Sequence, residues 1–108
     1  MTKITIVKHD GKYRGFECQG HSGYAESGED VVCAAISVLT LNTINSIDHF
    51  LDDEISVTTN EKDGVIQCYF MGELSEGAKL LMDSLEFGLI SIANQYGEQY
   101  IKVETEEV

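Results

Sequence analysis

The sequence predicts an α+β fold: a two-layer sandwich in which two helices cover one face of a largely antiparallel sheet of about five strands. Two pairs of strand-like segments are each followed by a long segment with helical apolar spacing, and one more strand-like segment follows the second helix. The 108 residues contain no linker or repeat, and this length allows a single core. We therefore expect residues 1–108 to form one domain with the order ββαββαβ.

The first two strands are predicted to form a hairpin. Apolar and polar residues alternate from Lys3 to Lys8, and Asp10-Gly11 is a strong two-residue turn signal. The chain returns over Tyr13–Gln19 with Phe16 and Cys18 on one face, as in a half-buried strand.

The first helix is predicted from Val31 to about Phe50, because apolar residues recur there every three or four positions. The acidic pair Asp52-Asp53 closes the segment. The predicted apolar face consists of Val32, Ala35, Ile36, Leu39, Thr43 and Ile47.

A second hairpin is predicted from Glu54–Thr59 and Val65–Met71, joined by the turn residues Asn60–Gly64. Ser75 then caps a second helix, and Gly97 fits its C-terminal end. The apolar face of this helix includes Ala78, Leu81, Leu85, Ile92 and Tyr96.

The last strand is predicted over Tyr100–Glu104, and the acidic end Glu104–Glu107 is expected to fray. Helices on one face leave the other face and the edges of the sheet open. A domain this small gains stability by burying apolar surface against a second copy, so we expect a homodimer.

The charge of the chain limits the classes of partner. Nineteen acidic and seven basic side chains give a formal net charge of −12. Such a surface repels nucleic acid and attracts basic polypeptides, although the same charge also fits a protein that only needs solubility. No apolar run reaches the length of a membrane span, and the first residues lack a secretion signal. We therefore expect a cytoplasmic protein without direct binding to nucleic acid or membrane.

The best candidate for chemistry is His21, in a glycine-rich loop, together with Cys33, at the start of the first helix. A thiol is a useful nucleophile as its thiolate, which a helix N-terminus and a nearby imidazole both stabilise. If Asp30 is the N-cap, Cys33 lies in the first turn, whereas Ser27 as the cap moves it to the second turn. Gly28, a poor helix residue, favours Asp30.

Two segments carry a resemblance to a known family: Gly20-His21-Ser22-Gly23-Tyr24-Ala25, and Asp30-Val31-Val32-Cys33-Ala34-Ala35, with Gly28 between them and Ser37 after them. They resemble the signature of the bacterial ribosomal-processing cysteine proteases, the Prp family, and the match spans the whole chain. The resemblance implies that Cys33 is the nucleophile and His21 the base. It also implies a homodimer and a substrate, the short N-terminal extension of large ribosomal subunit protein twenty-seven. That extension ends near two aromatic residues, followed by small and basic ones.

The expected mechanism is a Cys33–His21 dyad, with the backbone N–H of Cys33 and that of a loop residue as oxyanion donors. Ser37, one turn after Cys33, is expected either to contact the sulfur or the substrate or to bond back to the Cys33 carbonyl. Asp30 is either the helix cap, the preferred role, or a third member that orients the imidazole. The loop residues expected to support or cover the substrate are Gly20, Ser22, Gly23 and Tyr24.

Two other classes of function compete with a protease. One is a non-catalytic module whose acidic face binds a basic ribosomal protein. The other is a zinc site built from Cys18, His21 and Cys33, which lacks a fourth ligand at a suitable spacing. We expect no metal and no cofactor, and we interpret Cys18 and Cys68 as core residues because both fall at apolar positions within strands.

Overall fold

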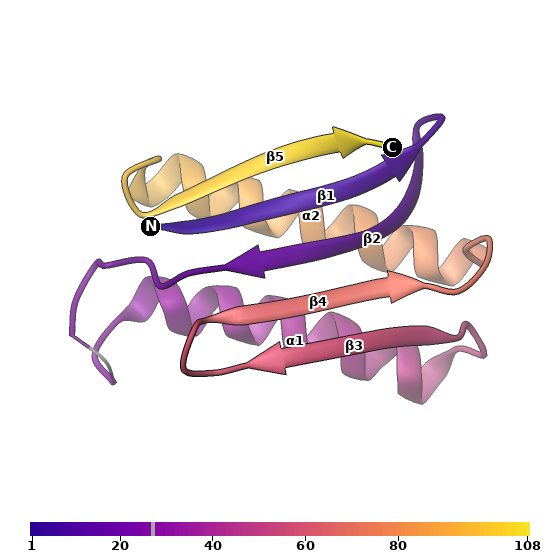
Figure 1. Ribbon diagram of the computed structural model, residues 1–108, viewed down its shortest axis with the longest axis horizontal. Coiled ribbons are helices and arrows are strands. Elements are labelled where there is room, and N and C mark those ends of the chain that lie inside the picture. The colour runs from indigo at the N-terminus through magenta and orange to yellow at the C-terminus, as the bar shows by residue number, and fades with distance from the viewer. Residues whose placement is uncertain (27) are drawn as a thin grey trace.

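The computed structural model describes residues 1–26 and 28–108. Its helices and strands follow the predicted order (Figure 1). The elements are β1 (Thr2–His9), β2 (Lys12–Gln19), α1 (Val31–Phe50), β3 (Ile55–Asn60), β4 (Val65–Phe70), α2 (Glu76–Tyr96) and β5 (Ile101–Glu107).

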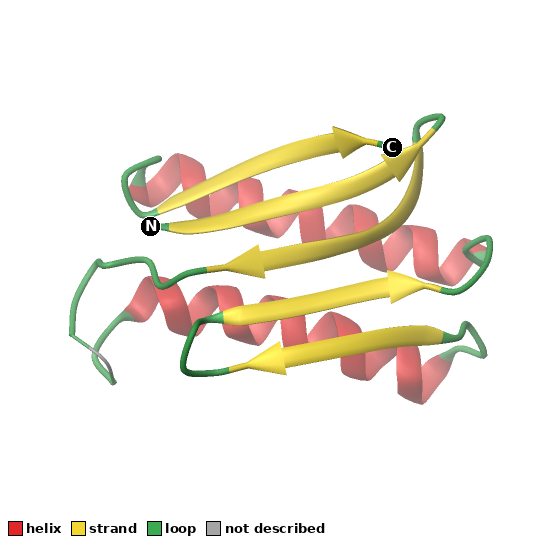
Figure 2. Cartoon of the chain, viewed as in Figure 1, coloured by secondary structure: helices red, strands yellow, loops and turns green. Residues whose placement is uncertain are grey.

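The five strands form one sheet in the order β3-β4-β2-β1-β5. Neighbouring strands are antiparallel except for β5, which runs parallel to β1. Both helices lie on the same face of this sheet (Figure 2). The predicted two-layer α+β sandwich with a largely antiparallel sheet is therefore confirmed.

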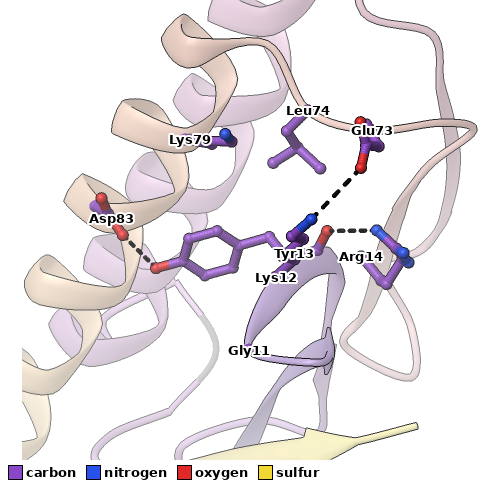
Figure 3. Close-up of a pocket in the computed structure, with 8 residues that line it drawn as sticks. All are labelled: Gly11, Lys12, Tyr13, Arg14, Glu73, Leu74, Lys79 and Asp83. Carbon is purple, nitrogen blue, oxygen red and sulfur yellow. Dashed lines mark hydrogen bonds and ion pairs between the residues drawn. The ribbon is translucent and has the colours of Figure 1, made fainter.

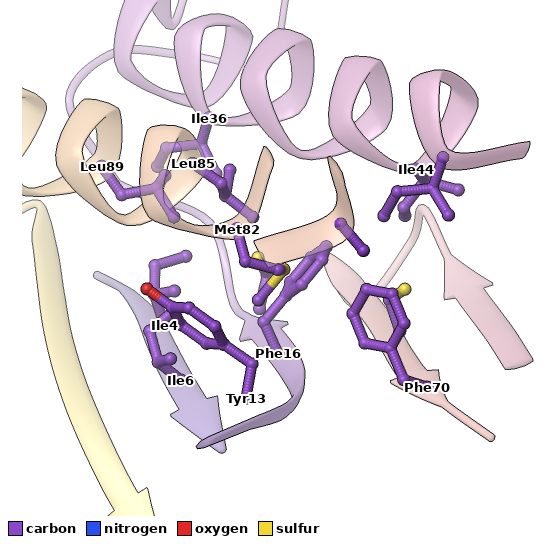
Figure 4. Close-up of a cluster of buried hydrophobic side chains, with 14 of the residues drawn as sticks. Ile4, Ile6, Tyr13, Phe16, Ile36, Ile44, Phe70, Met82, Leu85 and Leu89 are labelled. Atoms are coloured by element: carbon purple, nitrogen blue, oxygen red, sulfur yellow. The ribbon is translucent and has the colours of Figure 1, made fainter. Parts of the chain in front are cut away.

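The core lies between the sheet and the two helices, where Phe16 of β2 and Met82 of α2 are fully buried (Figure 4). Removing a large aliphatic or aromatic side chain from water stabilises the fold by about 1.5–3 kcal/mol. Cys18 and Cys68 are buried as predicted. The buried face of α2 differs in part from the prediction, because Met82 and Leu89 are buried there. The predicted residues Leu81, Ile92 and Tyr96 lie beside the core and are only partly buried.

The acidic C-terminal end is paired into the sheet, so the expectation that Glu104–Glu107 frays is wrong. β5 continues through Glu107 and pairs with β1 as far as Lys8. The Nζ atom of Lys3 lies 3.4 Å from Glu104 Oε2, and the Val108 N–H donates to the Lys8 carbonyl at 2.8 Å. Ladder hydrogen bonds and the ion pairs of Glu104 with Lys3 and Lys102 offset the repulsion between the glutamates.

Helix α1 has the length and composition of a membrane span, with a mean hydropathy of 1.5, so the expectation that no segment reaches this length is wrong. A helix that forms one side of a protein core can have the same length and mean hydropathy as a membrane span. Val32, Ile36 and Ile47 of α1 are buried in this core, which accounts for part of the apolar composition of the helix, while Val38 and Phe50 are exposed.

Candidate active site

Cys33 is the third residue of α1, and its thiol is half-buried. Asp30 is the N-cap: its Oδ1 accepts the Cys33 N–H at 2.9 Å, as the preferred prediction requires. The alternative cap, Ser27, lies outside the described residues. In the first turn, free backbone N–H groups and the aligned peptide dipoles favour negative charge on the sulfur.

The second carboxylate oxygen of Asp30 holds the loop that precedes the helix. It accepts the Ser22 hydroxyl at 2.5 Å and the Tyr24 N–H at 3.2 Å. Burial by itself would raise the pKa of Asp30, but the hydrogen bonds from Ser22 and Cys33 outweigh it and lower the pKa to about 2. Asp30 is thus a cap that also ties the loop to α1.

The loop backbone reaches the sulfur directly, because the Ser22 N–H donates to Cys33 Sγ at 3.2 Å. Ser22 itself is buried. The Cys33 N–H, predicted as an oxyanion donor, is instead occupied by the Asp30 cap. Among the described residues, the Ser22 N–H is the backbone donor that bonds to the sulfur.

His21 is exposed, and its ring Nε2 lies 3.1 Å from the Lys62 carbonyl oxygen in the β3–β4 turn. Within residues 1–26 and 28–108, no hydrogen bond joins its ring to the Cys33 sulfur, so the expected direct contact is absent from this conformation. Gly64 of this turn packs against the Gly20 carbonyl, so the turn lies beside the ring.

Cys33 and His21 line the same cavity of about 740 Å³, at the end of the sheet where β2 ends and α1 begins. Of the other predicted residues, Gly20, Gly23, Asp30 and Ser37 also line it, so Ser37 is placed to meet a substrate. Sequence reasoning missed further lining residues, because they lie on α1, the β3–β4 turn and β4, far from the motif. These residues include Leu41, Asn60, Glu61, Val65 and Ile66.

Tyr24 lies against the end of α2 rather than in the cavity. Its ring makes edge-on contacts with Tyr96, at 5.4 Å between centroids, and with Tyr100, at 5.1 Å. Neither partner was singled out as a site residue from the sequence. Tyr24 is thus held through its backbone N–H by Asp30 and through its ring by Tyr96 and Tyr100.

Cys18 and Cys68 differ from Cys33 in burial. Burial raises the pKa of the Cys18 thiol to about 12 and that of Cys68 to about 11. A thiol that holds its proton so strongly is a poor nucleophile near neutral pH. In the part of the chain that the structure describes, no three histidine, cysteine, aspartate or glutamate side chains gather as a metal site.

A second cavity, of about 350 Å³, lies at the opposite end of β2 (Figure 3). Its polar groups bond to one another: the Tyr13 hydroxyl donates to Asp83 at 2.5 Å, and Lys12 Nζ lies 3.6 Å from Glu73. None of the described residues that line it is a cysteine, serine or histidine. The cavity at Cys33 is the better candidate for covalent chemistry.

A nucleophile at a helix start, capped by the aspartate of the motif and facing a cavity shared with a histidine, fits a thiol protease. Residues 1–102 match the family described as Cysteine protease Prp. The chain belongs to this family. It is therefore a cysteine protease of the ribosomal-processing type, and the predicted family and enzyme class are confirmed.

Individual relatives agree with the Prp assignment. The chain is 28% identical over 101 residues to the ribosomal processing cysteine protease Prp of Bacillus subtilis, which covers 89% of this chain and 90% of the relative. Two crystal structures of the essential ribosomal processing protease Prp from Staphylococcus aureus share the fold. One, with a covalently linked product peptide, has a TM-score of 0.92 at 21% identity. The other, with a substrate peptide, has a TM-score of 0.87 at 20% identity. Each match covers 98% of this chain and 100% of that chain.

Proposed function

We propose that this Prp family protein is an endopeptidase with Cys33 as nucleophile and His21 as general base and acid. Its proposed substrate is the N-terminal extension of large ribosomal subunit protein twenty-seven. The observation that carries the proposal is the place of the Cys33 thiol, half-buried in the first turn of α1 and on the wall of a cavity that His21 also lines. The relatives bound to a substrate peptide and to a product peptide support a peptide as the ligand of this cavity.

The reaction begins when the Cys33 thiol gives its proton to His21 and the sulfur attacks the carbonyl carbon of the scissile peptide bond. A C–S bond forms and the carbonyl oxygen becomes an oxyanion. The C–N bond then breaks as His21 returns the proton to the leaving amine. Water, deprotonated by His21, hydrolyses the thioester and restores the thiol.

The proposed oxyanion donor is the Ser22 N–H. It already lies 3.2 Å from the sulfur, so a carbonyl oxygen bonded to the attacked carbon comes within its reach. Removing one such donor costs about 10²–10³-fold in kcat in other enzymes. Asp30 serves this donor indirectly, since it holds the Ser22 side chain in place.

The lining of the cavity fits the proposed substrate. Among the residues 1–26 and 28–108 that line it, Asp30 and Glu61 are acidic and none is lysine or arginine, which favours basic residues in the peptide. Leu41, Val65 and Ile66 add an apolar wall that suits aromatic side chains. Both features agree with an extension that ends in aromatic, small and basic residues.

Cleavage of a synthetic peptide tests the proposal. Wild type, Cys33→Ser and His21→Ala are each incubated with a peptide of that N-terminal extension, and the products are identified by mass spectrometry. We expect one cut by the wild type and a loss of at least 10³-fold in each variant, with an unchanged circular dichroism spectrum. Cleavage that survives in Cys33→Ser removes the proposed nucleophile. Binding without cleavage by the wild type supports the alternative, an acidic module that binds a basic ribosomal protein.

A homodimer and a cytoplasmic location stay predictions. Apolar side chains exposed on the outer faces of the helices support the dimer, since Val38 of α1 is 67% exposed and Phe87 of α2 is 76% exposed. Sedimentation equilibrium of the wild type and Phe87→Glu tests it. The dimer prediction requires the wild type to show twice the chain mass, and a monomer at every concentration contradicts it.

A further inference from the structure

We propose that the β3–β4 turn, residues 60–64, belongs to the catalytic machinery: the Lys62 carbonyl oxygen orients the His21 ring and fixes its tautomer, so that Nδ1 is the atom that takes the proton from Cys33. This inference rests on the proposed dyad and adds to it a positioning group that lies about 40 residues further along the chain. The two motif segments that carry the family resemblance do not include this turn.

The tautomer follows from the chemistry of the contact. His21 Nε2 lies 3.1 Å from the Lys62 carbonyl oxygen. A carbonyl oxygen can only accept a hydrogen bond, so Nε2 must carry the hydrogen. In the neutral imidazole the other nitrogen, Nδ1, is then without a proton and is free to act as the base.

The turn is built to hold this carbonyl still. The Asn60 side chain donates to Asp63 Oδ2 at 2.9 Å and accepts the Asp63 N–H at 3.2 Å. The Gly64 N–H also donates to the Glu61 carbonyl at 3.2 Å. Three hydrogen bonds thus close a five-residue turn around Lys62, whose own carbonyl is directed to His21.

Gly64 shows how closely the turn approaches the histidine loop. Its φ is +64°, and a Cβ there would lie 2.6 Å from the Gly20 carbonyl oxygen and 3.2 Å from His21 Cε1. Such a side chain is excluded by both the backbone conformation and the neighbouring atoms. Only glycine lets the turn pack against the backbone and the ring of the catalytic histidine.

The contact also stabilises the charged intermediate. When Cys33 transfers its proton, Nδ1 gains it and the ring becomes an imidazolium, while Nε2 keeps its hydrogen. The bond to the Lys62 oxygen then becomes charge-assisted and stronger. The same group therefore positions the base and stabilises the product of proton transfer, and the carbonyl itself gains no proton.

Nitrogen NMR of the wild-type protein tests the tautomer without any cleavage assay. In ¹⁵N-labelled protein, at a pH where His21 is neutral, we expect hydrogen on Nε2 and a pyridine-type signal from Nδ1. The His21 signals are assigned by their loss in His21→Ala, which separates them from those of His9 and His49. Hydrogen on Nδ1 in the neutral ring would overturn the inference and would leave the test of Cys33 and His21 by peptide cleavage untouched.

A matched pair of glycine variants tests the role of the turn. Gly64→Ala and Gly11→Ala both place a side chain at positive φ in a hairpin turn, but the Gly11 Cβ would meet no atom within 4 Å and lies at the opposite end of β2. We expect Gly64→Ala to lower kcat by about tenfold or more, with a smaller change in KM and a mixture of His21 tautomers, while Gly11→Ala keeps wild-type kcat. Equal kcat values and the wild-type tautomer in Gly64→Ala would overturn the inference.

A second variant of the turn covers the case in which Gly64→Ala does not fold. Asn60→Ala removes two hydrogen bonds inside the turn and introduces no clash. We expect Asn60→Ala to lower kcat and to give a mixture of His21 tautomers, as in Gly64→Ala, but by a smaller amount. A wild-type tautomer and a wild-type kcat in this variant would contradict the positioning role.

Discussion

Asp30 shows how one side chain near the N-terminus of α1 links the stability of the protein to its chemistry. Its Oδ1 caps the helix through Cys33, and its Oδ2 accepts bonds from Ser22 and Tyr24. The same carboxylate therefore sets the start of the helix and the place of the loop N–H that meets the sulfur.

The acid stability of the protein is expected to depend on Asp30. Its pKa is lowered in the folded state from an ordinary value of 3.8 to about 2, so the unfolded chain binds the proton more readily. The stabilisation is present above about pH 4 and is lost as the pH falls through about 2. We expect Asp30→Asn to lower the free energy of unfolding by about 1 kcal/mol at pH 7 and to equal the wild type near pH 2. Urea unfolding across this range measures the difference, and a constant difference at every pH would contradict it.

Selective alkylation is expected to separate the three thiols. Cys33 lies half-buried on a cavity, whereas the pKa of buried Cys18 is about 12 and that of buried Cys68 about 11. Iodoacetamide at neutral pH should therefore modify Cys33 at least tenfold faster than either of the others. Peptide mapping by mass spectrometry follows each site over time. Equal rates at the three cysteines would show that the site does not activate Cys33.

Local signals predicted the residues around Cys33, and contacts across long sequence distances explain what was missed. The capping pattern placed Asp30 and Cys33 correctly, because a cap depends on residues three apart. The Lys62 carbonyl carries no side-chain signature, and its approach to His21 depends on how β4 pairs with β2. The apolar wall residues, such as Leu41 and Val65, also become neighbours only in the folded chain.

At the scale of elements, the position of the loop between β2 and α1 is fixed by its contacts with both helices. Tyr24 connects it to the end of α2 through Tyr96 and to the turn before β5 through Tyr100, while Asp30 connects it to α1. The rings of Tyr24 and its two partners lie nearly perpendicular, at 83° and 74°, a favourable edge-to-face geometry. The end of α2 thereby influences a site to which it contributes no lining residue.

Removing one of these rings is expected to weaken catalysis from a distance. Tyr96→Ala loses an aromatic contact worth about 0.5–1.5 kcal/mol, so the loop leaves its docked position more often and the Ser22 N–H leaves the sulfur. We expect kcat/KM to fall about two- to tenfold, as this energy converts at about 1.4 kcal/mol per factor of ten. Tyr96→Phe keeps the ring and should stay near wild type. Peptide cleavage assays compare the three proteins, and equal kcat/KM in Tyr96→Ala would remove the docking role.

The elements were predictable to different degrees. Both hairpins and both helices follow from short-range periodicity and turn residues, and their bounds agree with the prediction to within one or two residues. The end of β5 was misjudged because its glutamates suggest exposure, whereas the parallel pairing with β1 depends on strands almost 100 residues apart. Local composition does not show which partner a strand meets.

At the scale of the whole molecule, the charges are unevenly distributed. The net charge is −12, yet three of the seven basic residues, Lys12, Arg14 and Lys79, line the cavity at the far end of β2, together with the acidic Glu73 and Asp83. The cavity at Cys33 is lined by Asp30 and Glu61, and no lysine or arginine is among its lining residues in the described part of the chain. We therefore expect a basic peptide to be attracted more strongly to the cavity at Cys33 than to the cavity of mixed charge at the other end of β2.

The uneven distribution of charge predicts that substrate binding depends on the salt concentration. The molecule measures 38 × 25 × 20 Å. At about 0.01 M salt the Debye length is roughly 30 Å, so charges over most of the molecule attract the peptide. At about 0.1 M salt it is roughly 10 Å, so only the charges near the cavity attract the peptide. We expect KM for a lysine-containing peptide to rise several-fold over this range while kcat stays constant, because the chemical step depends on groups within the cavity.

A matched peptide with glutamine in place of lysine provides the control, since it carries no charge to be attracted or screened. Its KM should hardly change with salt, and at low salt it should exceed the KM of the lysine peptide. If both peptides respond equally, the acidic surface contributes solubility alone and recognition comes from the apolar wall of the cavity. A salt effect on kcat for the lysine peptide would instead mean that charges outside the cavity reach the reacting atoms, contrary to a local dyad positioned by neighbouring backbone groups.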